Sequence, residues 1–170
     1  MKRCSDQGSE SEKNLLLSNN VTTIIDLRTD EERTKKQCPL IEDSRFTYYV
    51  FTITDGDKIP LHTDDVSKSY IGMVDAKFCD MIEFLLKVKS NVLYFCNAGK
   101  DRTGVVSAIL LYKSGYTVDY IVADYMKSKE NLKEVLTAFA SQNPEIDINV
   151  ITPNEQYIKE FLDWFAKKEV

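Results

Sequence analysis

The stretch 94–104 combines the residue types needed to bind and attack a phosphate, with a thiol at Cys96, a guanidinium at Arg102 and two glycines. The apolar run 91–95 before it predicts a strand, and the apolar run 105–112 after it predicts a helix. Backbone N–H groups in such a strand-to-helix turn converge on one point, where the positive end of the helix dipole also lies. The stretch is therefore predicted to be an anion site that contains a nucleophile.

The bare spacing of Cys96 and Arg102 carries little weight, because composition alone gives such a pair with odds of about one in eight. The surrounding residues are more specific, since Gly99 and Gly104 let the backbone curl and Thr103 adds a hydroxyl. The alternative makes Cys96 a small buried residue that ends a core strand, the usual place of a cysteine. A purely structural loop has no need of these residues together, so we favour the phosphate site.

Residues 96–104, CNAGKDRTG, resemble the Cys-x5-Arg-Ser/Thr signature of the cysteine-dependent protein phosphatases. The Lys100 and Asp101 pair resembles the bacterial tyrosine/serine (dual- or triple-specificity) branch, some of whose members also hydrolyse phosphoinositides. Residues 23–32, TIIDLRTDEE, are similar to the Ile-Asp-Leu-Arg-Ser-x-x-Glu segment of that branch, and residues 121–128 match more weakly. The resemblance covers most of the chain. It implies a protein-tyrosine-phosphatase-like α/β fold, with a central, mainly parallel sheet flanked by helices.

The composition fits one domain over residues 1–170, because 43% hydrophobic residues can form one sizeable core. A net charge of −5 argues against nucleic-acid partners and against a general affinity for anionic membranes. The four cysteines include no CxxC pair, and no signal peptide precedes them, so we expect a cytoplasmic protein without disulfides, metal or cofactor. Apolar runs are far shorter than the ~20 residues that cross a bilayer, so we expect no membrane insertion. We also expect a monomer.

The periodicity of apolar residues predicts strands and helices in alternation, which favours parallel strands joined by helical crossovers. Residues 1–12 are expected to be poorly ordered, and the resemblance implies a short N-terminal family segment. The predicted elements are a helix over 12–18 capped by Ser11, a strand over 21–27, a helix over 30–36, strands over 46–54 and 91–95, a helix over 67–89 in two pieces around Gly72, and helices to 114, over 118–128, over 130–140 and over 153–167, the last with Pro153 in its first turn.

Asp26 and Arg28 stand at the end of the predicted strand 21–27. Ligands of open α/β sheets sit beyond the carboxyl ends of strands, so these side chains could lie close to the Cys96 loop. A structural ion pair, or a cap on the helix that follows, explains them equally well. Both interpretations stay open at this stage.

A long polar loop follows the strand 46–54 and contains Asp55, Asp57 and the only histidine, His62. Long loops in small domains are often lids or binding segments, so we expect a mobile cover for the site here. A solvated acidic surface loop is the alternative.

The predicted chemistry is phosphoryl transfer to Cys96, because a helix N-terminus and a nearby guanidinium both favour thiolate over thiol. Attack on phosphorus would give a phosphocysteine intermediate, and donors already in place would meet the charge that grows on the oxygens. Thr103 could donate a hydrogen bond to the sulfur or cap the following helix. No metal is required. The residues predicted to bind phosphate are Asn97, Ala98, Gly99, Lys100, Asp101 and Arg102.

One carboxyl group could protonate the leaving group and then activate water. Asp101 is the first candidate because it is fixed beside the phosphate, Asp26 is the second, and Asp55 or Asp57 in the possible lid over residues 55–65 is the third. Asp101 could instead accept hydrogen bonds that stabilise the loop. Lys100 is either a solvated surface lysine or a second cation of the loop. In the second case the resemblance implies that the enzyme tolerates substrates with extra phosphates.

The resemblance has one departure, since Phe95 stands where the family usually has histidine. The leading hypothesis is a phosphomonoester hydrolase that acts on phosphotyrosine in proteins, with phosphoserine/threonine or phosphoinositide as further substrates. One rival is a catalytically weak module that binds phosphorylated partners. Two features suggest it: Phe95 stands in place of the usual histidine, and the proton donor is not assigned to a single residue. A second rival is sulfur transfer of the rhodanese kind, which does not require Arg102 and Thr103.

Overall fold

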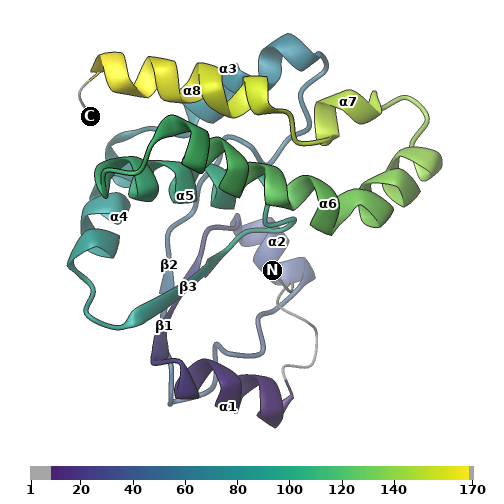
Figure 1. The fold of residues 1–170 in the computed structure, drawn as a ribbon. Coiled ribbons are helices and arrows are strands. Elements are labelled where there is room, and N and C mark those ends of the chain that lie inside the picture. Colours follow the sequence, from purple (N-terminus) through teal and green to yellow (C-terminus); the bar gives the residue numbers. More distant parts are fainter. Residues whose placement is uncertain (1–8, 169–170) are drawn as a thin grey trace.

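The computed structural model describes residues 9–168, and its centre is a sheet of three parallel strands (Figure 1). The strands are β1 (Val21–Asp26), β2 (Thr47–Val50) and β3 (Asn91–Phe95), in the order β2-β1-β3. The helices are α1 (Glu10–Ser18), α2 (Asp30–Lys35), α3 (Val66–Gly72), α4 (Ala76–Lys87), α5 (Asp101–Lys113), α6 (Val118–Gln142), α7 (Ile148–Ile151) and α8 (Glu155–Lys168), with a 3-10 turn η1 (Thr63–Asp65) before α3. The expected α/β architecture with a parallel sheet and flanking helices is confirmed.

Both faces of β1 are covered, because successive side chains on a strand point to opposite faces of the sheet. Ile25 packs with residues of α3, α4, α5 and α8, and together they form the larger core. Ile24 belongs to a smaller core, whose other members come from the segment 38–46 and from β3, and α1 packs against it. Both residues are fully buried, which explains why this strand is a continuous run of β-branched and apolar residues up to Asp26.

The register places the ends of β1 and β3 side by side, with Asp26 opposite Phe95. The N–H group of Leu27 continues the ladder by donating to the Phe95 carbonyl at 2.9 Å. The chain leaves β1 toward α2 and leaves β3 toward α5, so both turns lie at the same edge of the sheet. This edge therefore carries the turn that contains Cys96.

Several predicted boundaries were wrong. α1 begins at Glu10 and is capped by Ser9 in a capping box with Glu12, so Ser11 is not the cap and the expected disorder does not hold from Ser9 on. The expectation for residues 1–8 lies outside the described residues. β2 ends at Val50, although the N–H group of Phe51 still donates to the Asp26 carbonyl.

The late helices also differ from the prediction. α6 is one continuous helix, where two were predicted, because no proline or glycine stands between residues 118 and 142 to end it. The short helix α7, capped by Asp147, was not predicted, and α8 begins at Glu155, so Pro153 precedes its first turn. The break near Gly72 is confirmed, since α3 ends there and α4 begins at Ala76. In Figure 1 the second half of α6 extends past α5, and the chain then turns back into α7.

Candidate active site

The thiol of Cys96 lies directly after β3 and is 8% exposed. Its sulfur accepts a hydrogen bond from the Gly99 N–H at 3.3 Å and another from the Thr103 hydroxyl at 3.2 Å. Gly99 has φ +73°, a left-handed conformation that residues with a side chain resist, and this turn brings its N–H back to the sulfur. Two donors aimed at one sulfur stabilise negative charge on it, as a nucleophilic thiolate requires.

The guanidinium of Arg102 is 3% exposed in the first turn of α5. Both terminal nitrogens donate to the Glu32 carboxylate at 2.6 Å, which makes a bidentate pair. Burial opposes the charge, but the hydrogen bonds of Glu32 and the charge of Cys96 raise the pKa of Arg102 overall. Its Nε is buried and has no hydrogen-bond partner among residues 9–168.

Glu32 was not among the predicted site residues. It occupies the third position of α2, where its side chain also accepts the Thr29 N–H at 2.9 Å in a capping box. Burial opposes its charge, yet the hydrogen bonds from Arg102 and Thr29 lower the pKa of Glu32 overall. The spacing Thr29-x-x-Glu32 is a capping-box signal in the sequence, but it gives no hint that the same carboxylate holds an arginine 70 residues away.

A cavity of about 330 Å³ opens over Cys96 and Arg102. Its lining combines charged and polar residues with apolar residues of α6 and α7. Its lining residues are Glu32, Gly56, Asp57, Lys58, Ile59, Pro60, Val66, Ser69, Cys96, Asn97, Ala98, Lys100, Asp101, Arg102, Leu132, Val135, Leu136, Phe139, Val150 and Ile151. The cavity thus brings Asp57 together with six of the predicted loop residues, whereas Gly99 and Thr103 line the neighbouring hollow between α5 and α6. Asp26 and Asp55 do not line the cavity.

The Asp101 carboxylate faces this cavity and is 26% exposed. Its Oδ1 accepts the Tyr70 hydroxyl at 2.7 Å and lies 3.0 Å from the Lys100 ammonium. Tyr70 is also within 2.8 Å of the Tyr125 hydroxyl, and burial together with Asp101 raises the pKa of Tyr70 well above its ordinary value. The tyrosine therefore remains a proton donor that fixes one carboxylate oxygen of Asp101. The other oxygen, Oδ2, accepts no hydrogen bond within the described part of the chain.

Lys100 is not the solvated surface lysine that was one interpretation of the sequence. It is 6% exposed, and its ammonium donates to the Ile151 carbonyl at 2.8 Å in addition to its contact with Asp101. The lysine thus ties the loop to α7 and also lines the cavity.

A family model described as "Tyrosine phosphatase family" matches residues 3–168, almost the whole chain. The chain belongs to this family. It is 28% identical over 143 residues to a tyrosine-protein phosphatase of Nostoc commune, a match that covers 77% of this chain and 49% of the relative. It is 45% identical over 51 residues to the triple specificity protein phosphatase PtpB of Mycobacterium tuberculosis, across 30% of this chain and 18% of the relative. The chain spans about half the length, or less, of these curated relatives.

In this member of the tyrosine phosphatase family, Asp26 and Arg28 form a buried ion pair. Asp26 is fully buried and accepts Nε and Nη2 of Arg28 at 2.9 and 2.6 Å, together with the Tyr48 hydroxyl. Burial opposes the charge of Arg28, but the contacts with Asp26 raise the pKa of Arg28 overall. Removing one partner of such a pair typically costs about 3–5 kcal/mol. The geometry therefore fits the structural interpretation of these residues, and Asp26 does not line the cavity.

Phe95, which replaces the histidine usual in the family, packs against the same ion pair. The guanidinium carbon of Arg28 lies 5.0 Å from the centre of its ring. An aromatic face attracts a cation, whereas a protonated histidine would repel one. The ring of Phe95 thus forms a favourable cation–π contact with Arg28. The two hydrogen bonds to the Cys96 sulfur come from Gly99 and Thr103 and do not involve Phe95.

The loop after β2 lies over Arg102. Gly56 has φ +78°, and a Cβ atom there would lie 2.1 Å from Cε of Met73 and 3.4 Å from Cγ of Arg102. Asp57 lines the cavity. Burial lowers the pKa of Arg102, whereas Glu32 and Cys96 raise it, and the charge of Asp57 adds a smaller increase. Asp55 instead packs against Gly72, outside the cavity. Of the two predicted lid aspartates, only Asp57 faces the site.

Two further observations bear on the predicted chemistry. No group of three or more His, Cys, Asp or Glu side chains suited to a metal ion occurs within residues 9–168. In the same part of the chain, no helix combines the length and the apolar character needed to cross a membrane.

Proposed function

We propose that this protein is a metal-independent phosphomonoester hydrolase that acts on phosphotyrosine in proteins through a phosphocysteine intermediate, in a reducing compartment such as the cytoplasm. The observation that carries the proposal is the arrangement of Cys96 and Arg102 in one cavity. The sulfur receives two hydrogen bonds, and the guanidinium is held by Glu32. Its Nε has no partner in the described part of the chain and is the donor that we assign to a phosphate oxygen. This arrangement supplies a nucleophile and a fixed cation for the phosphate oxygens.

In the first step the Cys96 thiolate attacks phosphorus, the S–P bond forms and the P–O bond to the leaving group breaks. Arg102 and the loop amides stabilise the equatorial oxygens, and the leaving oxygen takes a proton from Asp101. In the second step Asp101 takes a proton from water, the hydroxide attacks phosphorus and the S–P bond breaks. The Thr103 hydroxyl, 3.2 Å from the sulfur, stabilises the thiolate as it leaves. The net reaction converts a phosphomonoester and water into an alcohol and phosphate.

Asp101 is the preferred acid because its Oδ1 is fixed by Tyr70 and Lys100 while Oδ2 is left to carry the proton. Asp57 is the alternative in the same cavity. Asp26 is excluded from this role in our proposal by its complete burial in the pair with Arg28.

The direct test of the function is hydrolysis of p-nitrophenyl phosphate and of a phosphotyrosine peptide in the presence of EDTA. We expect release of inorganic phosphate from both, because every group in the proposed mechanism belongs to the protein. Acid quenching during turnover should trap phosphate on the protein in acid-stable form, as expected of a thiophosphate ester. Binding of the peptide without any release of phosphate would instead favour the phosphate-binding module.

Replacement of Asp101 by asparagine tests the proton donor. We expect kcat for the phosphotyrosine peptide to fall about 10²–10⁴-fold, the usual contribution of a general acid, with a much smaller fall for p-nitrophenyl phosphate, whose leaving group needs no proton. Asp57→Asn is the matched control, since Asp57 lines the same cavity. If Asp57→Asn shows the strong dependence on the leaving group and Asp101→Asn does not, the roles assigned to the two residues are wrong.

A further inference from the structure

The second half of α6 presents an apolar stripe to the active-site cavity. Leu132, Val135, Leu136 and Phe139 recur at helical spacing, and all four line the cavity. The buried residues of α6, by contrast, are Ile121, Val122 and Tyr125 in its first half. The side chains of Val135 and Phe139 are 41% and 38% exposed, so the stripe contributes little to the core of the protein.

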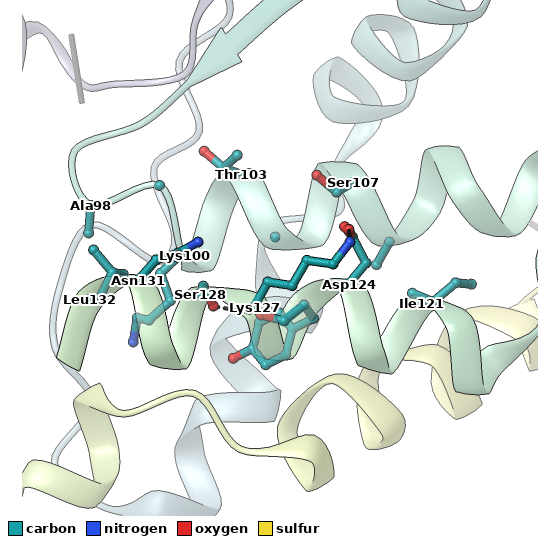
Figure 2. A pocket seen from close by; sticks show the side chains of 14 residues that line it. Ala98, Lys100, Thr103, Ser107, Ile121, Asp124, Lys127, Ser128, Asn131 and Leu132 are labelled. Atoms are coloured by element: carbon teal, nitrogen blue, oxygen red, sulfur yellow. Dashed lines mark hydrogen bonds and ion pairs between the residues drawn. The ribbon is translucent and has the colours of Figure 1, made fainter. Parts of the chain in front are cut away.

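The stripe begins beside the phosphate loop and runs outward. Leu132 and Ala98 line both the active-site cavity and a second hollow of about 220 Å³ between α5 and α6. Figure 2 shows the two side chains close together at one end of that hollow. Phe139 lies seven residues further along α6, a distance of about 10 Å along the helix axis. The phosphorylated ring of a substrate bound at Cys96 would therefore lie nearest Leu132. Phe139 would contact only the substrate groups beyond that ring.

The loop after β2 supplies a second apolar wall to the same cavity. Ile59 and Pro60 line it, and Ile59 is 43% exposed. The lining of the cavity therefore includes apolar groups from two separate segments of the chain, α6 and the loop after β2.

The charges that line the cavity give no surplus for additional phosphates. Arg102 is paired with Glu32, and Lys100 is paired with Asp101. The remaining lining charges are Asp57 and Lys58, which are opposite in sign. A headgroup with several phosphates needs a cation for each one, because an anion without a partner is costly to desolvate. The site thus favours one phosphate on an otherwise apolar group.

We propose that the α6 stripe and the 59–60 wall make this protein selective for phosphotyrosine peptides with a bulky apolar residue beside the phosphotyrosine. This inference rests on the proposed phosphatase function. An apolar neighbour buries its surface between the two walls, whereas an acidic neighbour would be desolvated there without a cation. We expect kcat/KM to be at least about 10-fold higher for the apolar neighbour.

The test compares two phosphotyrosine peptides that differ only in leucine or glutamate next to the phosphotyrosine. The ratio of their kcat/KM values should fall from at least about 10 toward 1 in the variants Val135→Ser and Phe139→Ser. Val118→Ser is the matched control, because Val118 is also an exposed valine of α6, likewise 41% exposed, and does not line the cavity. That control should keep both the ratio and the absolute rates of the wild type.

The possible results separate this inference from the proposed function. A wild type that does not hydrolyse p-nitrophenyl phosphate contradicts the phosphatase proposal, and the inference falls with it. A wild type that hydrolyses p-nitrophenyl phosphate but treats both peptides alike overturns the inference alone, as does a preference that survives in both stripe variants. A soluble short-chain phosphoinositide with several phosphates serves as a third substrate, and a higher kcat/KM for it than for the leucine peptide also overturns the inference.

Discussion

Replacement of Cys96 by serine should abolish turnover, with kcat lowered on the order of 10⁴–10⁶-fold, as when other hydrolases lose their nucleophile. A serine hydroxyl remains protonated at neutral pH and is a much weaker nucleophile than a thiolate. The cradle around the sulfur should survive, because Gly99 and Thr103 can donate to an oxygen as they do to sulfur. We therefore expect the variant to bind a phosphotyrosine peptide while failing to release phosphate. Titration calorimetry and a phosphate-release assay measure the two properties separately.

Cys79→Ser is the matched control for this experiment. Cys79 is a partly exposed thiol on α4, and it does not line the active-site cavity. It should retain wild-type kcat and KM. Residual activity of Cys96→Ser within about 100-fold of the wild type would contradict the phosphocysteine mechanism.

Replacement of Arg102 by lysine should lower kcat/KM for a phosphotyrosine peptide by about 10³–10⁵-fold, the range found for arginines that stabilise a transferring phosphoryl group. Lysine carries the charge but offers one compact ammonium, so it cannot hold Glu32 through two nitrogens and present a further donor to the phosphate. Steady-state kinetics with the peptide, together with circular dichroism to verify the fold, measure the effect.

The variant Glu32→Gln tests whether Glu32 acts by holding the Arg102 guanidinium in position. The amide keeps the shape of the side chain but loses the charged acceptor, so the guanidinium of Arg102 should be held less firmly in its position. We therefore expect a decrease in kcat that is larger than the increase in KM. If Glu32 acts through Arg102, the double variant Glu32→Gln/Arg102→Lys should have nearly the same kcat/KM as Arg102→Lys alone. Arg45→Lys is the control, since Arg45 belongs to a surface ion-pair cluster with Asp43 and Glu10. Losses that simply add in the double variant would contradict the positioning role of Glu32.

The sequence determined the groups whose contacts are local. The positions of Cys96, Gly99 and Thr103 are fixed by a turn between one strand and one helix. The sequence therefore predicted loop amides near the sulfur and left Thr103 open between a bond to the sulfur and a cap on the helix. The parallel sheet could be predicted for a similar reason, because a continuous β-branched run such as β1 is typical of a strand buried on both faces. The break between α3 and α4 follows from the glycine at which α3 ends.

Only the tertiary structure decided the partners of the charged residues. Glu32 meets Arg102 across 70 residues, Lys100 meets the Ile151 carbonyl across 51, and Tyr70 meets Asp101 across 31. Spacing along a chain carries no information on such pairs, since they depend on how α2, α3 and α7 pack around the loop. The sequence left Asp26 equally suited to catalysis and to an ion pair, and the burial of Arg28 and Tyr48 beside it favours the ion pair.

The same reasoning explains α6. The sequence pattern around residue 129 predicted two helices where one forms, and the apolar residues at 132, 135, 136 and 139 could have belonged to a core. Packing leaves them facing the cavity, because the core is already filled by the first half of the helix. Thus the sequence by itself determined the turn that carries the proposed nucleophile, because the geometry of that turn is local. The tertiary structure decided which carboxylates and which apolar walls surround that loop, because those contacts join segments far apart in the chain.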